Sequence, residues 1–112
     1  MNWIPLTSED KLKDIKEKSF SVPQLIFKHS TRCSISSMAK SRLERGDAPA
    51  DVDFHYLDLI AHRNISNAIA EAFQVAHESP QILLIKNGDC VYDESHSAIN
   101  MDDIAEEAGK VA

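Results

Sequence analysis

Apolar and polar positions along the chain follow two periods, which predict strands and helices in alternation. Short continuous apolar runs, such as Leu25-Ile-Phe27, are typical of strands buried on both faces. Stripes that recur every three or four positions, such as Ile65, Ile69 and Phe73, are typical of helices that bury one face. The predicted elements are an edge strand over 3–6, a helix from Ser8, a strand over 22–29, a helix over 34–45, a strand over 52–60, a helix over 64–76, strands over 81–86 and 89–93, and a helix over 98–110.

Local signals fix several boundaries of these elements. Ser8, followed by two acidic residues, is a typical helix N-cap, and Gly46-Asp47 ends the helix over 34–45. Asn87-Gly88 between two strands predicts a hairpin with a type I′ turn. Ile35, Met38, Ala39 and Leu43 are expected on the buried face of the helix over 34–45, and Ile104 and Ala108 on that of the last helix.

The order of elements predicts an α/β fold. Two strand-helix-strand units followed by a hairpin and a helix give a mixed sheet of four or five strands with helices on both faces. No low-complexity linker or repeat divides the chain, so residues 1–112 are expected to form one domain. Loops at the carboxyl ends of parallel strands are where α/β proteins place their sites.

Composition narrows the functional classes. The chain is 43% hydrophobic and 27% charged, as soluble globular proteins are, and its net charge of −6 argues against nucleic-acid binding. No apolar run approaches the roughly 20 residues of a membrane span, and the N-terminus does not read as a secretory signal. We therefore expect a cytoplasmic protein without a membrane partner, in which the two cysteines are free or catalytic.

Cys33 is the candidate for chemistry because it stands between a predicted strand and a predicted helix. A thiol there faces unpaired backbone N–H groups and the positive end of the helix dipole, and both favour the reactive thiolate. Arg32 adds a positive charge and can meet a carboxylate of a small-thiol ligand, although a solvated surface arginine is the alternative. Thr31 and Ser34 are expected to satisfy N–H groups at the helix start.

Three longer segments carry a resemblance. Pro80, an apolar strand and Lys86-Asn87-Gly88 resemble the proline-strand-turn segment of the thioredoxin fold. Phe27-Lys-His-Ser-Thr-Arg-Cys-Ser-Ile-Ser36, Ser79-Pro-Gln-Ile-Leu-Leu-Ile85 and Tyr92-Asp-Glu-Ser-His-Ser97 together resemble the YtxJ-type monothiol bacilliredoxins, small bacterial proteins. The resemblance implies a thiol-disulfide oxidoreductase that removes bacillithiol from mixed disulfides of client proteins.

The resemblance also implies roles for individual residues. Cys33 and Ser36 form C-x-x-S, in which Ser36 can bond the Cys33 thiolate but cannot close an intramolecular disulfide. The chemistry is then monothiol, with a low-molecular-weight thiol as co-substrate and no bound cofactor. Pro80 resembles the cis-proline beside the thioredoxin-fold cysteine, and the Ser79 backbone would pair with the substrate as an added strand.

Other residues invite competing interpretations. Cys90 is expected opposite Ile85, at the far end of the strand that Pro80 opens, and therefore fills the core instead of resolving a disulfide. The sequence has neither C-x-x-C nor H-x-x-x-H, so no metal site is expected; His29 can lie near the site, and His55 is expected to be structural. Two alternative functions remain: a glutaredoxin-like protein that uses another small thiol, and a non-catalytic thioredoxin-fold module that senses oxidation.

Overall fold

A five-stranded mixed sheet is the centre of the computed structural model, which describes residues 1–110. Its strands lie in the order β1-β3-β2-β4-β5, with β1, β3 and β2 parallel and with β4 and β5 antiparallel to their neighbours. The strands are β1 (Ile4–Pro5), β2 (Gln24–His29), β3 (Asp53–Asp58), β4 (Gln81–Lys86) and β5 (Asp89–Ser95). The helices are α1 (Glu9–Lys18), α2 (Ser34–Arg45), α3 (Arg63–Phe73), the short 3-10 helix η1 (His96–Ala98) and α4 (Met101–Gly109).

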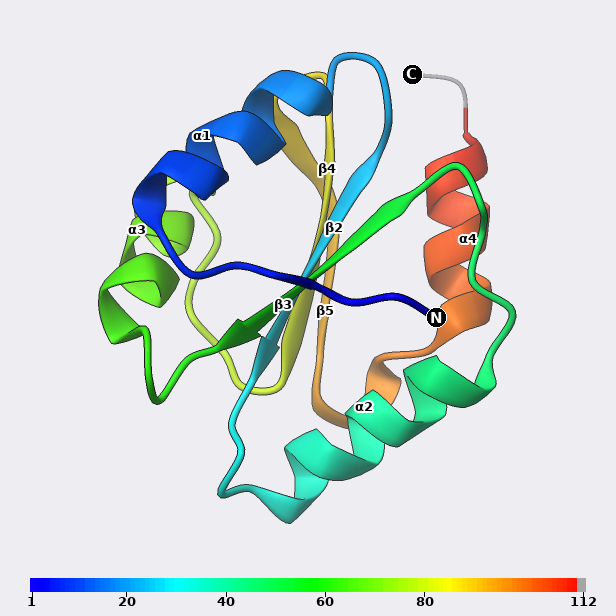
Figure 1. The fold of residues 1–112 in the computed structure, drawn as a ribbon. Helices are drawn as coiled ribbons and strands as arrows, with labels where there is room; N and C mark the ends of the chain where they lie inside the picture. Colours follow the sequence, from blue (N-terminus) through cyan, green and yellow to red (C-terminus); the bar gives the residue numbers. More distant parts are fainter. Residues whose placement is uncertain (111–112) are drawn as a thin grey trace.

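Helices cover both faces of the sheet, as the sequence predicts (Figure 1). Because side chains alternate along β2, Leu25 and Phe27 pack with α2 and α4 on one face. Ile26 points to the other face and packs with α1 and α3. The central strand is therefore buried on both sides, which explains its continuous apolar run.

Several predicted boundary signals are confirmed. The Ser8 hydroxyl accepts a hydrogen bond from the Lys11 N–H at 3.2 Å and so caps α1. Asn87 and Gly88 both have positive φ, at 53° and 83°, as a type I′ turn requires. The hairpin that they close pairs Ile85 with Cys90, as expected.

The buried face of α2 differs from the prediction. Ile35 and Met38 are 53% and 62% exposed, whereas Ser36, Ala39 and Leu43 are fully buried. The buried residues are spaced by three and four positions, so the helix is turned by about one residue from the orientation that its apolar side chains favour. Hydrogen bonds of Ser36 account for this orientation, as described below.

Two other helix bounds are shifted. The predicted helix over 64–76 ends at Phe73, because Gln74 has a left-handed conformation with φ of 56°. The predicted helix over 98–110 begins only at Met101, after η1, because the Asn100 side chain accepts a hydrogen bond from the Asp103 N–H at 2.9 Å. This N-cap could be found in the sequence, since Asn precedes two acidic residues there.

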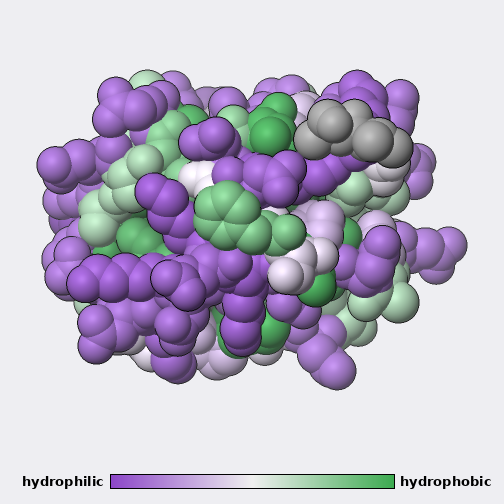
Figure 2. Space-filling view, turned by 90° about the horizontal axis from the view of Figure 1, so that it is seen from above, coloured by the Kyte–Doolittle hydropathy of each residue, from purple (hydrophilic) through white to green (hydrophobic). Residues whose placement is uncertain are grey.

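The start of α2 and the face shown in Figure 2 lie at opposite ends of the sheet. Figure 1 shows α2 beginning below the carboxyl end of β2, and Figure 2 shows the molecule from the opposite end. That opposite end is largely hydrophilic, with apolar residues in separate islands (Figure 2). Among residues 1–110, no helix has both the length and the apolar character needed to span a bilayer.

Candidate functional site

Cys33 lies at the point where β2 has ended and α2 begins. It is the N-cap residue of α2 and is half-buried. Its N–H donates to the Ser30 carbonyl at 3.2 Å, and its own carbonyl accepts from the Ser37 N–H at 3.0 Å. The Cys33 side chain makes no capping hydrogen bond, so the backbone holds the loop while the sulfur stays available beside the start of a 12-residue helix.

The neighbours of Cys33 in sequence are exposed. Thr31, Arg32 and Ser34 all lie on the surface. The expected capping by Thr31 and Ser34 is wrong, because α2 has no side-chain cap and neither hydroxyl is hydrogen-bonded within the described chain. Arg32 is exposed and forms no ion pair among residues 1–110.

Ser36 does not bond Cys33, and this corrects the sequence-based expectation. Its hydroxyl lies 2.6 Å from His29 Nδ1 and accepts from the Ser30 N–H at 3.0 Å. Ser36 is fully buried, and His29, the last residue of β2, is 5% exposed. The serine of C-x-x-S therefore ties the first turn of α2 to the end of β2.

Ser79 and Pro80 lie at the same end of the sheet as the Cys33 loop. Lys28, near the end of β2, pairs with Gln81, which directly follows Pro80. The Ser79–Pro80 peptide bond is cis, as the resemblance implies, and Pro80 is buried. The Ser79 hydroxyl is buried without a hydrogen-bond partner in the described part of the chain.

Cys90 lies far from this site. Ile85 pairs with Cys90 on one side and with Gln24, the first residue of β2, on the other. The steps from Gln24 to His29 separate Cys90 from the Cys33 loop by about 16 Å, well beyond the ~7 Å that a disulfide spans between Cα atoms. Burial raises the pKa of Cys90 to about 11, so this thiol stays protonated at neutral pH.

No metal site accompanies the thiol in the described chain. Residues 1–110 contain no group of three or more His, Cys, Asp or Glu side chains placed to hold a metal ion. Instead, the His29 ring stacks on Phe27, with centroids 5.6 Å apart, and lies 5.5 Å from the Tyr56 ring. The His29 ring therefore packs between aromatic side chains of the sheet and contacts Ser36 in the first turn of α2.

His96 is a site neighbour to which sequence reasoning gave no role. Its N–H donates to the Pro80 carbonyl at 3.0 Å, and its carbonyl accepts from Arg42 Nη2 at 3.3 Å. Its φ of 56° is left-handed, which is uncommon for a residue other than glycine. His96 lies within the segment Tyr92–Ser97 that carries part of the family resemblance. The contacts of His96 with Pro80 and Arg42 depend on tertiary packing, which the sequence does not reveal.

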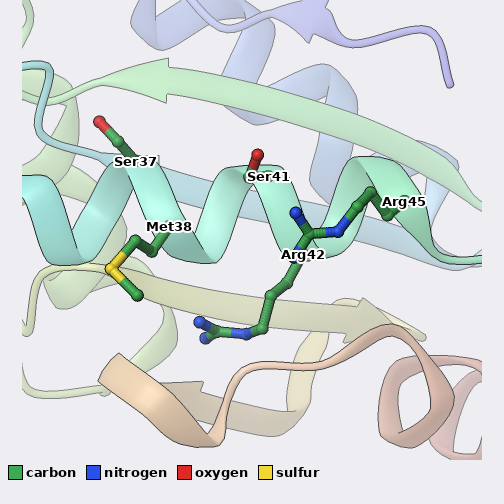
Figure 3. Close-up of a pocket in the computed structure, with 5 residues that line it drawn as sticks. All are labelled: Ser37, Met38, Ser41, Arg42 and Arg45. Atoms are coloured by element: carbon green, nitrogen blue, oxygen red, sulfur yellow. The ribbon is translucent and has the colours of Figure 1, made fainter.

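A groove of about 380 Å³ follows the exposed side of α2 from one turn beyond Cys33 (Figure 3). Met38 and Arg42 point to one edge of the groove, and Ser37 and Ser41 point to the other (Figure 3). Arg45 runs back along the helix and adds a second guanidinium. The groove thus combines an apolar side chain with two positive charges in a chain whose net charge is −6.

Comparisons with known proteins agree with this geometry. Residues 4–104 match the family described as "Monothiol bacilliredoxin BrxC". A solved structure titled "A putative oxidoreductase with a thioredoxin fold" is similar at 32% identity and a TM-score of 0.78, over 93% of this chain and 91% of that one.

More distant structures share the fold. The thioredoxin of Malassezia sympodialis is 18% identical, with a TM-score of 0.72 over 94% of this chain and 86% of that one. Mitochondrial thioredoxin 3 of Saccharomyces cerevisiae is 16% identical, with a TM-score of 0.73 over 97% and 95%. The chain belongs to the monothiol bacilliredoxin family and has the thioredoxin fold, and its general function is thiol-disulfide exchange.

Proposed function

We propose that this protein removes bacillithiol from mixed disulfides on cytoplasmic client proteins, with Cys33 as the nucleophile. One observation carries the proposal: the two cysteines lie far apart. Cys33 is a half-exposed thiol at the start of α2, whereas Cys90 lies on β5, level with the first residue of β2. A disulfide within the chain is therefore out of reach. The second thiol of the reaction has to come from solution, which is the definition of monothiol exchange.

Two exchange steps complete the proposed cycle. In the first, the Cys33 thiolate attacks the bacillithiol sulfur of the mixed disulfide; the sulfur–sulfur bond breaks, and the client leaves as a thiolate that takes up a proton. In the second, a free bacillithiol thiolate attacks the Cys33–bacillithiol disulfide. Cys33 leaves as a thiolate, and bacillithiol disulfide is released. Each step exchanges one disulfide for another, so no further oxidant or reductant is needed.

The surroundings of Cys33 suit such substrates. We assign the exposed guanidinium of Arg32 to a carboxylate of the small thiol. The groove with Met38, Arg42 and Arg45, which begins one helical turn beyond Cys33, is assigned to the small thiol or the client. The Ser79 backbone, two residues before the start of β4, is assigned to pair with the extended client chain.

The test is the release of bacillithiol from a protein that carries it as a mixed disulfide, with free bacillithiol in excess. We expect Cys33→Ser to abolish turnover and Cys90→Ser to leave it within about twofold, because Cys90 lies about 16 Å from the Cys33 loop and takes no part in exchange. Intact mass after a separate incubation with bacillithiol disulfide, without free bacillithiol, should show one bacillithiol on the wild-type protein and none on Cys33→Ser.

The same assay separates the alternatives. Turnover with glutathione but not with bacillithiol would favour a glutaredoxin-like protein. One modification per molecule without turnover would favour a non-catalytic redox-sensing module. Equal loss of activity in Cys90→Ser, or a bridge between Cys33 and Cys90, would contradict the monothiol mechanism.

A further inference from the structure

A chain of hydrogen bonds connects the buried end of β2 to the backbone of Cys33. The Ser36 hydroxyl contacts His29 Nδ1 at 2.6 Å and accepts from the Ser30 N–H at 3.0 Å. The Ser30 carbonyl in turn accepts from the Cys33 N–H at 3.2 Å. Through these bonds the position of the Cys33 backbone depends on two buried side chains, His29 and Ser36, that do not touch the sulfur.

The partners of Ser36 determine which way its proton points. A hydroxyl carries one proton, and Ser36 oxygen accepts from the Ser30 N–H, which has no other role. A buried hydroxyl needs an acceptor for its proton, and His29 Nδ1 is the one acceptor that contacts Ser36 Oγ among residues 1–110. We therefore assign the Ser36 proton to this bond, in which Nδ1 is unprotonated. The pair is complete only when His29 is neutral, with its own proton on Nε2.

Packing keeps the His29 ring in this orientation. Phe27 stacks against it with an interplanar angle of 29°, and Tyr56 lies on it with centroids 5.5 Å apart. Both rings belong to the sheet, Phe27 to β2 and Tyr56 to β3. The imidazole is thus fixed to the rigid part of the molecule, and Ser36 transmits that position to the loop.

We propose that Ser36, held by His29, is the positioning residue for Cys33, and that it fixes the direction from which the sulfur meets a disulfide. The inference rests on the proposed exchange at Cys33 and gives the serine of C-x-x-S a function in it. An exchange step requires the three sulfurs in line, so it is sensitive to the orientation of Cys33. Alkylation by iodoacetamide is also an in-line displacement, but this reagent is small enough to reach that geometry from many directions around the sulfur.

Acid should disrupt the pair. Protonated His29 would present an Nδ1–H toward the Ser36 proton, and the buried hydroxyl would have to turn to a position without an acceptor. The charged and titratable groups around His29 are Lys40 and Glu44 of α2, and Asp58 and Tyr56 of β3. Burial and then Lys40 lower the pKa of His29, while Asp58 and Glu44 raise it, and the net shift is downward.

The experiment compares Ser36→Ala, His29→Phe and His29→Asn with the wild type. Ser36→Ala removes the link; His29→Phe keeps an aromatic ring but removes the acceptor; His29→Asn keeps an acceptor near the position of Nδ1. The primary readout is the rate at which oxidised bacillithiol forms a mixed disulfide with Cys33, followed by mass. This single step can be measured even if the protein does not turn over, so a failure of the proposed function is distinguishable from a failure of this inference.

We expect Ser36→Ala and His29→Phe to slow mixed-disulfide formation ~10-fold or more, and His29→Asn to restore most of the rate. Iodoacetamide should alkylate Cys33 within about twofold of the wild-type rate in all three variants, since this small reagent can approach the sulfur from many directions. Because the pKa of His29 is lowered, the ratio of wild-type to His29→Asn rates should fall only in acid stronger than that which protonates an ordinary histidine, since only the wild type loses its pair on protonation.

Cys90 reports on folding in the same samples. Its side chain is partly buried, and burial raises its pKa to about 11, so it resists alkylation while the protein is folded. Rapid alkylation of Cys90 would identify a variant that has unfolded, in which case His29→Asn and the pH ratio decide the question. Wild-type exchange rates in Ser36→Ala with Cys90 protected, or a pH-independent ratio, would overturn the proposal.

Discussion

His55 should make the protein acid-sensitive through a buried hydrogen-bond network on the α1 side of β3. Its Nε2 lies 2.7 Å from Gln24 Oε1, and Gln24 Nε2 donates to Asp53 Oδ2 at 2.9 Å. Gln24 is fully buried and His55 is 6% exposed. Since Gln24 donates through its nitrogen, its oxygen accepts from the Nε2–H of His55.

The size of the effect follows from the pKa. Burial is the main cause that lowers the pKa of His55 from 6.5 to about 4, with Asp53 raising it and Lys18 lowering it. The unfolded chain then binds a proton more readily than the folded chain. The stabilising contribution of neutral His55 is present in full above pH 6.5 and is lost as the pH falls through this window toward 4. The loss is ~2 kcal/mol between pH 7.5 and 5 and ~3 kcal/mol at pH 4.

Urea unfolding of the wild type and His55→Gln from pH 7.5 to 5 measures this loss, with the fluorescence of Trp3 as the probe. Gln keeps a donor for Gln24 but does not titrate, so the stability gap between the two proteins should narrow by ~2 kcal/mol toward pH 5. Phe54→Leu, a non-titrating change on the same strand, should give a gap that does not vary with pH. A constant gap for His55→Gln as well would refute the argument that the folded protein keeps His55 neutral.

Three further substitutions test the packing. Lys28 is fully buried and has no acidic partner among residues 1–110, and burial lowers its pKa to about 8. Lys28→Met should therefore raise the free energy of unfolding at pH 7 by ~2 kcal/mol, as measured by urea unfolding. Gly46→Ala would place a Cβ 2.6 Å from Met101 Cβ and should lower the free energy of unfolding in urea by ~1–3 kcal/mol. Gly88→Ala should cost ~1 kcal/mol in the same assay, mainly because its φ is +83°.

The order and type of the elements could be predicted because each depends on local periodicity. The continuous run in β2 and the Asn87-Gly88 turn both act over a few residues, and the structure confirms them. The buried face of α2 could not be predicted in this way. Ser36 is buried because His29 and Ser30 satisfy its hydroxyl, and these bonds join residues of different elements that hydropathy does not connect.

The position of Cys33 in the fold could be predicted from the sequence, but not all of the residues that surround the site. Cys33 lies at the start of α2 as expected, and the cis bond before Pro80 is present. His96 escaped notice because its left-handed backbone is not a preference of the residue type. It is held by the Pro80 carbonyl and by Arg42, which is 54 residues away in sequence. Such long-range bonds set the geometry of a site without leaving a local signal.

The exposure of Ile35 and Met38 follows from the same orientation of α2 that buries Ser36. If the first turn were rotated to bury these apolar side chains, Ser36 would leave His29 and Ser30 without their hydrogen-bond partner. The cost is exposed apolar surface directly after Cys33. Under the proposed function, that surface lies where a client and a second small thiol both have to approach. The hydrogen bonds that orient the thiol and the open surface that admits its partners thus arise from one rotation of α2.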